Sequence, residues 1–253
     1  MKKKRINITD KLLQSCLIAA ILAVWQLLSS LHIVPKFLLP SPYDVAAAFC
    51  RDFKLILYHT GYTLSETVYG LLIGAAFGFV LALLMDRFAV VKKALYPPII
   101  VSQTIPTVAV APLLVLWMGY NMLPKITLVA MTTFFPVTVS LIDGFLSADT
   151  DGIKLLKAMG ANGVQLYRHV KLPYALPYFL AGLRISVTYA VIGAVVAEWL
   201  GGFYGLGVYM TRARKSYSFD KMFAVIFFIS ALSLTAMSAL AFAEKKFVKW
   251  KSG

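Results

Sequence analysis

Charged residues are scarce in this chain of 253 residues. Asp, Glu, Lys and Arg make up only 14% of it, whereas hydrophobic residues make up 60%. Soluble globular domains carry about 25% charged residues, so this composition excludes an ordinary soluble domain. Several apolar runs exceed the length of about 18 residues that identifies a transmembrane helix. The sequence therefore predicts an all-α integral membrane protein.

Acidic residues are the rarer charge, with 11 Asp and Glu against 25 Lys and Arg, which gives a net charge of +14. A basic protein of this kind can bind nucleic acid, but here the basic residues cluster between the apolar runs. The two-to-one excess of basic residues on one side is the pattern that the positive-inside rule describes. It predicts a multi-pass protein of the cell membrane with both termini in the cytoplasm, and it gives no reason to expect a nucleic-acid partner.

Residues that bind metals or catalyse reactions are few and scattered. The chain has two cysteines and three histidines, and these do not occur at metal-ligand spacing. It has no H-E-x-x-H and no G-x-x-x-x-G-K-[ST], the motif whose backbone cradles ATP phosphates. We therefore expect no metal site, no cofactor and no catalytic residue in this chain, which is predicted not to be an enzyme.

Six apolar runs organise the chain, which we read as one transmembrane domain over residues 1–253. The first run follows the basic segment MKKKR and resembles a signal peptide, but it is long and lacks a clear cleavage site, so we predict a retained span. Residues 43–57 are predicted to form a short interfacial helix. The predicted spans cover approximately residues 12–31, 61–85, 94–118, 126–146, 174–197 and 222–243.

The third run is rich in proline. Proline interrupts helical hydrogen bonding, and in membranes such breaks occur where backbone lines a cavity or packs against protein. This run is therefore our best indication of the solute pathway, although a merely bent helix is an equally good interpretation. Its pathway candidates are Ser102, Gln103, Thr104 and Pro106.

Glycines recur every four residues in the second run, at Gly70, Gly74 and Gly78. Small residues at this spacing let helices approach closely in lipid. We expect them to pack within the bundle, with a dimer face as the alternative.

The longest polar segment between apolar runs covers residues 149–173. Asp149, Thr150 and Asp151 are good helix N-caps, and apolar residues follow at helical spacing. Gly160 interrupts this first helix, and a second short run is predicted to end at Leu172-Pro173. Two short amphipathic helices joined at glycines allow close approach of another backbone, while an amphipathic loop on the membrane surface is the simpler alternative.

This segment resembles the cytoplasmic loop of ABC-importer permeases, which has the form E-A-A-x-x-x-G, about nine residues, then I-x-L-P. Gly160-Ala161 and Val170-Lys171-Leu172-Pro173 match the later part. The chain departs from the motif at its start, where Lys154, Leu155 and Leu156 replace Glu-Ala-Ala. The resemblance implies that these residues form coupling helices that dock in a groove of an ATPase subunit.

The whole chain is similar to permeases of the nitrate, sulfonate and taurine branch, with further matches over residues 105–126 and 183–210. The resemblance implies a type I ABC-importer permease fold with six transmembrane helices and a cytoplasmic coupling-helix loop. It also implies a permease homodimer, two ATPase subunits that bind ATP and Mg, and an extracytoplasmic substrate-binding protein.

The resemblance leaves the substrate open among nitrate, sulfonates such as taurine, and pyrimidine precursors of thiamine. Glu198 and Trp199, before a glycine-rich loop, resemble the pyrimidine-precursor members. Arg184 lies inside the fifth run, where a charge needs a partner or water. It either binds an anionic substrate or pairs structurally, for example with Asp143.

An ATP-independent secondary transporter or channel is the alternative of another class. Its expected mark is a set of intramembrane acids for ion coupling. Glu66, Asp143 and Glu198 lie near span ends rather than centrally, which favours the ABC permease. An intramembrane enzyme has no motif to support it.

Overall fold

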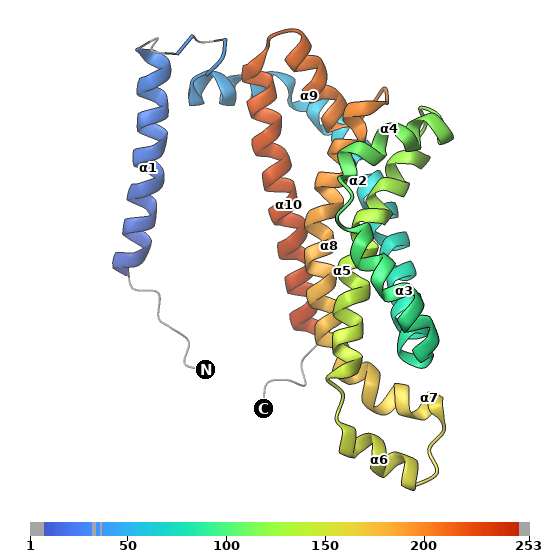
Figure 1. Ribbon diagram of the computed structural model, residues 1–253. Coiled ribbons are helices and arrows are strands. Elements are labelled where there is room, and N and C mark those ends of the chain that lie inside the picture. Colours follow the sequence, from blue (N-terminus) through green and yellow to red (C-terminus); the bar gives the residue numbers. More distant parts are fainter. Residues whose placement is uncertain (1–7, 32–33, 36, 248–253) are drawn as a thin grey trace. The chain divides into compact units, whose positions relative to one another are not determined.

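The computed structural model describes residues 8–31, 34–35 and 37–247, and this part of the chain is almost entirely helical (Figure 1). The basic segment 2–5, Lys36, Lys249 and Lys251, which we used for orientation, lie outside the described residues. The elements are α1 (Ile8–Ser30), α2 (Pro42–Arg87), α3 (Ala89–Ser102), α4 (Thr107–Met118), α5 (Leu123–Leu146), α6 (Thr150–Ala158), α7 (Gly163–Leu166), the π-helical turn η1 (Tyr167–Lys171), α8 (Leu172–Leu200), α9 (Leu206–Lys215) and α10 (Phe219–Phe247).

Within the described residues, four helices are long and apolar enough to cross a membrane. A fifth candidate is the pair α3 and α4, which together have the length and composition of one span. Helix α1 has a shorter apolar part, Ser15–Ser30. The multi-pass prediction is confirmed, and the count of six spans stays a prediction. The four long candidates are Pro42–Arg87, Leu123–Leu146, Gly163–Leu200 and Phe219–Glu244.

The separate interfacial helix predicted for residues 43–57 is wrong. Helix α2 runs without a break for 46 residues, from Pro42 to Arg87. The polar residues between the expected helix and the second span include no proline, and one glycine, Gly61, costs a helix only about 1 kcal/mol. The helix therefore continues through them.

The third predicted span is broken rather than gently bent. Helices α3 and α4 meet at 101° across residues 103–106. Pro106 stands directly before α4 with extended backbone, which a proline ring favours and which also disfavours helix in the residue before it. Pro97, Pro98 and Pro112 lie inside the two helices. Of the four prolines in this run, only Pro106 therefore coincides with the break.

The chain forms two compact units. The first comprises residues 1–57 and 209–228, and the second comprises residues 58–208 and 229–253. In the first unit, the Trp25 ring contacts Phe223 and Phe227.

Polar contacts of the first unit centre on Asp52. This carboxylate pairs with Lys221 at 2.7 Å and accepts a hydrogen bond from Tyr209 at 2.7 Å. Burial raises the pKa of the Tyr209 phenol, and the neighbouring carboxylate raises it further.

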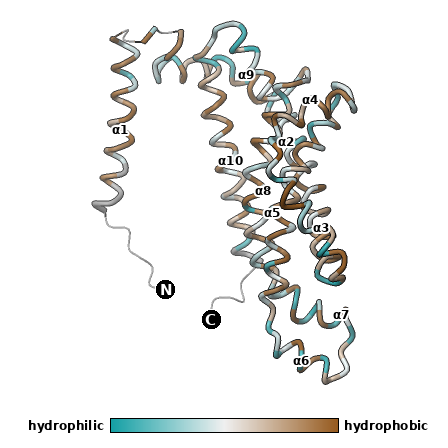
Figure 2. Tube along the Cα trace, viewed as in Figure 1, coloured by the Kyte–Doolittle hydropathy of each residue, from teal (hydrophilic) through white to brown (hydrophobic). Residues whose placement is uncertain are grey.

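The core of the second unit lies along α5 and α8, which pack side by side (Figure 1). Small residues bring the two backbones together, because Gly182 of α8 lies against Pro136 and Ser140 of α5. Figure 2 shows that hydrophobic residues dominate these helices, whereas hydrophilic residues are frequent on α6 and α7. One buried cluster comprises Ala82, Met85, Ile99, Val137, Leu141, Ile142, Phe145 and Ala175.

The glycine repeat of α2 packs inside the second unit, as expected. A Cβ atom at Gly70, Gly74 or Gly78 would overlap α5, respectively near Val129, Thr133 and the carbonyl of Phe134. The three glycines therefore form the surface on which α2 packs against α5.

Candidate functional site: the loop 149–173 and a cavity at the α3–α4 break

The segment 149–173 forms two short helices, as predicted. Asp149 caps α6, and its side chain accepts a hydrogen bond from the Asp151 amide at 3.0 Å. Asn162 and Gln165 cap α7 reciprocally, in a capping box. Between the helices, Gly160 has φ +81°, a left-handed conformation that glycine adopts without the cost of a Cβ atom.

Helices α6 and α7 expose apolar side chains. Neither helix has a buried residue, and Leu155, Met159 and Val164 are 62%, 74% and 76% exposed. Figure 1 shows α6 and α7 projecting from the ends of α5 and α8. This exposed apolar face is suited to contact with another molecule.

The prediction that Leu172-Pro173 ends the second short helix is wrong. Residues 163–200 form one continuous helical segment, in which α7 passes through η1 into α8. Pro173 lies in the first turn of α8, where proline is tolerated. The wider π-helical turn immediately before it leads into α8 without ending the helix.

The base of the loop is fixed to the end of α2. Asp86 accepts a hydrogen bond from the Tyr167 phenol and pairs with Lys171 at 2.6 Å. Val170 is buried beside them. In contrast, Lys154 pairs with Asp151, three residues before it, and both side chains are mostly exposed. The loop is thus held by polar contacts where it joins the bundle and is exposed at its tip.

Two hollows flank the loop. One, of about 600 Å³, is lined partly by Leu172, Pro173 and Phe79. The other, of about 490 Å³, is lined partly by Gly163 and Val164. Of the residues that match the permease motif, Leu172 and Pro173 therefore line an indented, largely apolar surface.

A third cavity, of about 630 Å³, lies at the break between α3 and α4. All four pathway candidates from the third run line it, together with residues of α5 and α8. Among the described residues, its lining includes hydroxyl and amide side chains but no Asp, Glu, Lys, Arg or His. Contact of these residues with a solute stays a prediction. The polar lining residues are Ser102, Gln103, Thr104, Thr107, Thr132, Ser140 and Tyr189.

The remaining pathway candidates lie elsewhere. Arg184 pairs with Glu244 of α10 rather than with Asp143, and its side chain is 45% exposed. Trp199 is exposed at the end of α8. Glu198 is buried, where it accepts hydrogen bonds from Thr63 at 2.7 Å and from the Gly207 amide at 2.5 Å. None of these three lines the cavity at the helix break.

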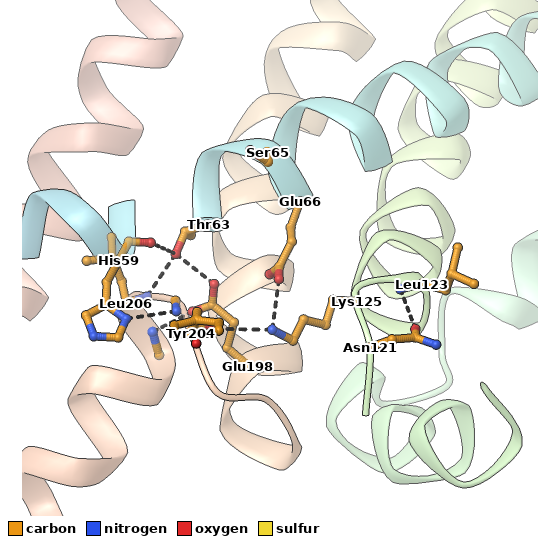
Figure 3. Close-up of polar contacts among 12 residues, drawn as sticks. His59, Thr63, Ser65, Glu66, Asn121, Leu123, Lys125, Glu198, Tyr204 and Leu206 are labelled. Atoms are coloured by element: carbon orange, nitrogen blue, oxygen red, sulfur yellow. Dashed lines mark hydrogen bonds and ion pairs between the residues drawn. The ribbon is translucent and has the colours of Figure 1, made fainter. Parts of the chain in front are cut away.

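Sequence reasoning missed the partners of Glu198. Figure 3 shows Glu66, Lys125 and Glu198 gathered with His59 and Thr63. Lys125, which directly precedes the predicted fourth span, is buried and pairs with Glu66 at 2.8 Å. Its place at the start of an apolar run resembles that of an ordinary flanking lysine, so its burial could not be predicted from the sequence.

Comparison with known proteins agrees with the fold. Residues 74–249 match the family described as binding-protein-dependent transport system inner membrane component. The formylaminopyrimidine transport permease protein ThiX of Halalkalibacterium halodurans is 37% identical over 232 residues, 91% of this chain and 92% of the relative. The putative aliphatic sulfonates transport permease protein SsuC of Bacillus subtilis is 31% identical over 92% of this chain and 86% of the relative.

Among solved structures, a chain of an amino acid ABC transporter crystallised with histidines superposes with a TM-score of 0.66. It is 18% identical, and the match covers 79% of this chain and 97% of that chain. This likeness supports the type I importer permease fold. The chain belongs to the family of binding-protein-dependent transport system inner membrane components and is a permease subunit of an ABC importer.

Proposed function

We propose that this chain forms the translocation pathway of an ATP-driven importer and receives its driving force through the loop 149–173. The exposed apolar face of α6 and α7 carries the proposal, because Leu155, Met159 and Val164 lie uncovered on two well-capped helices. Exposed apolar residues between hollows are typical of a docking surface. The partner is an ATPase subunit that binds ATP and Mg.

The complete importer in this proposal contains two permease copies, two ATPase subunits and an extracytoplasmic binding protein. The loop 149–173 then lies in the cytoplasm together with both termini, in agreement with the excess of basic residues on that side. Family membership and the charge pattern favour this arrangement over the ATP-independent transporter.

We further propose an uncharged, heteroaromatic solute such as a formylated aminopyrimidine. The cavity at the α3–α4 break has hydroxyl and amide groups with apolar surroundings, and the described part of the chain contributes no charged residue to its lining. A sulfonate anion in such a cavity would lack a countercharge, which makes burial costly. The greater identity to the formylaminopyrimidine permease than to the sulfonate permease, 37% against 31%, supports the same choice.

The docking proposal is tested best at Gly163, the first residue of α7. A Cβ atom at Gly163 meets no atom of the described residues within 4 Å, so we expect the isolated permease to accept tryptophan there. At a packed interface the same bulk costs about 1–3 kcal/mol or more. We expect Gly163→Trp to reduce co-purification of the ATPase at least roughly fivefold, or to uncouple ATP hydrolysis from transport.

Gly61→Trp is the matched control, since Gly61 also has open space around its Cβ position and lies on α2, far along the chain. Gly160 is a poorer probe, because its φ of +81° strains any side chain whether or not a partner docks. Normal assembly and normal coupling in Gly163→Trp would contradict docking at this face.

A further inference from the structure

A buried group of charges lies at the end of the second unit opposite the loop 149–173. Glu66, Lys125 and Glu198 are 1%, 5% and 1% exposed. They come from α2, α5 and α8, and Figure 3 shows them converging beside the glycine-rich loop that precedes α9. We call these three residues the buried charge cluster.

Glu198, together with His59 and Thr63, holds the start of α9 in place. The amides of Gly205, Leu206 and Gly207 donate hydrogen bonds to His59, Thr63 and Glu198, at 3.0, 2.9 and 2.5 Å respectively. The Glu198 carboxyl therefore accepts a bond from the N-terminus of a ten-residue helix, where negative charge is favoured.

The glycine-rich loop closes over the charges. Gly205 has φ +122°, and a Cβ atom there would overlap the Glu198 carboxyl group. A Cβ atom at Gly202 would lie 2.7 Å from the Lys125 ammonium nitrogen, while the Tyr204 carbonyl accepts a hydrogen bond from that nitrogen at 3.3 Å. The backbone of this loop thus covers the cluster and excludes water from it.

The charges of the cluster do not balance if both acids are ionised. His59 accepts a hydrogen bond at Nδ1, so that nitrogen carries no proton and the imidazole is neutral. Lys125 is then the one cation among the described residues that face the two carboxyl groups. Two carboxylates and one ammonium would leave a surplus negative charge in a buried site, an arrangement that proteins avoid by binding a proton.

One atom indicates where that proton lies. Glu66 Oε1 accepts the hydrogen bond from Lys125, whereas Glu66 Oε2 is buried and has no hydrogen-bond partner in the described part of the chain. The Glu198 carboxyl group lies next to it and interacts with it electrostatically. A proton between the two carboxyl groups satisfies this atom and removes the surplus charge.

We propose that Glu66 and Glu198 form a carboxyl pair that shares one proton, and that this proton keeps the glycine-rich loop and the start of α9 packed against α2, α5 and α8. The pair binds the proton as a unit, as closely spaced acids do. Loss of the proton places two like charges side by side and weakens the packing of the loop against these helices.

Glu66→Gln provides the first test, because glutamine has the shape of a neutral carboxyl group and its amide can donate to Glu198. The folded wild-type complex holds a proton that the unfolded chain releases above about pH 4–5. Its thermal midpoint should therefore fall as the pH rises through the neutral range. The slope of the free energy of unfolding against pH, the stability slope, should correspond to one proton. We expect Glu66→Gln to fold, to have a higher midpoint at alkaline pH, and to lose this slope.

Infrared spectroscopy of the purified complex gives the second test. A protonated carboxyl group has a carbonyl stretch distinct from that of a carboxylate, and this band should shift in heavy water. The band should disappear in Glu66→Gln and also in Glu198→Gln, while the exposed acid variant Asp143→Asn keeps it.

Four results would overturn the proposal. The first two are an unchanged infrared band and an unchanged dependence of stability on pH in Glu66→Gln. The third is failure of Glu66→Gln to accumulate. The fourth is a stability of the wild-type complex that depends on sodium or potassium concentration at fixed pH. The last result would indicate a bound metal cation in place of the proton. If Glu198→Gln does not fold but Glu66→Gln does, the result for Glu66→Gln decides, because only Glu198 also caps α9.

Discussion

At the scale of single residues, Arg184 shows how much of an ion pair can be predicted from the sequence. The sequence predicted an arginine deep in a span, in need of a partner. The structure supplies Glu244, near the far end of α10, as that partner. No spacing rule connects residues 60 positions apart, so the need for a partner was predictable and its identity was not.

The ion pair predicts a structural role for Arg184. Arg184→Ala leaves Glu244 without its partner, and we expect roughly a twofold to fivefold loss of folded protein in the membrane, the effect of about 0.5–1 kcal/mol for a partly exposed pair. Arg184→Lys should restore abundance only partly, because lysine lacks the planar fork of donors.

Quantitative immunoblotting and solute uptake, measured in parallel, check this prediction. Glu244→Gln should resemble Arg184→Ala, which makes it a matched variant for the same pair. Normal abundance of Arg184→Ala with a selective loss of uptake would instead assign the arginine to the pathway.

At the scale of elements, three apolar runs were located well, whereas the places where helices break or continue were not. The runs placed α5, α8 and α10 within a few residues, because burial in lipid demands continuous hydrophobicity. Pro106 coincides with a break, yet Pro97, Pro112 and Pro173 do not. Whether proline breaks a helix depends on what the neighbouring helices and turns can satisfy, and a single sequence does not contain that information.

The loop 149–173 was predicted in more detail than any other element. Its caps and glycines are local signals, and local hydrogen bonds decide short helices. The buried charge cluster was missed for the opposite reason. It brings together residues of α2, α5 and α8 that are far apart in the sequence, and the acids lie near span ends where solvated charges are common.

Packing between α5 and α8 predicts a strong effect at Gly182. A Cβ atom there would lie 2.7 Å from the Pro136 carbonyl oxygen and 2.8 Å from the Ser140 side chain. Gly182→Val should push the helices apart and destabilise the protein by about 1–3 kcal/mol. We expect a lower thermal midpoint in detergent, measured as the fraction of purified protein that stays monodisperse after heating.

Gly61→Val is the control for this substitution, because its Cβ position is open. Both variants add the same side chain to a helix, so the difference between them isolates the interhelical contact. Equal midpoints for the two proteins would show that α5 and α8 do not pack as described.

At the scale of the whole molecule, the proposed orientation is open to a test with the two native cysteines. Cys16 and Cys50 are both exposed on the protein, so neither is shielded by packing within the chain. Cys50 precedes the apolar part of α2 and should face the outside, whereas Cys16 lies in the first span, where lipid covers it.

An impermeant thiol reagent on intact cells should therefore label Cys50 and not Cys16. The variants Cys50→Ser and Cys16→Ser identify which residue reacts. Labelling of Cys50 only after permeabilisation would reverse the orientation and place the loop 149–173 on the wrong side for an ATPase.

The central claim is that this permease imports its solute only when an ATPase docks on the loop 149–173. Uptake of a labelled formylaminopyrimidine into proteoliposomes, containing the permease with its ATPase and supplied with the binding protein, tests it most directly. The account predicts uptake that requires Mg-ATP on the ATPase side, is lost in Gly163→Trp and kept in Gly61→Trp, and is not inhibited by excess aliphatic sulfonate. Uptake by the permease alone, driven by a pH gradient without ATP, would contradict it.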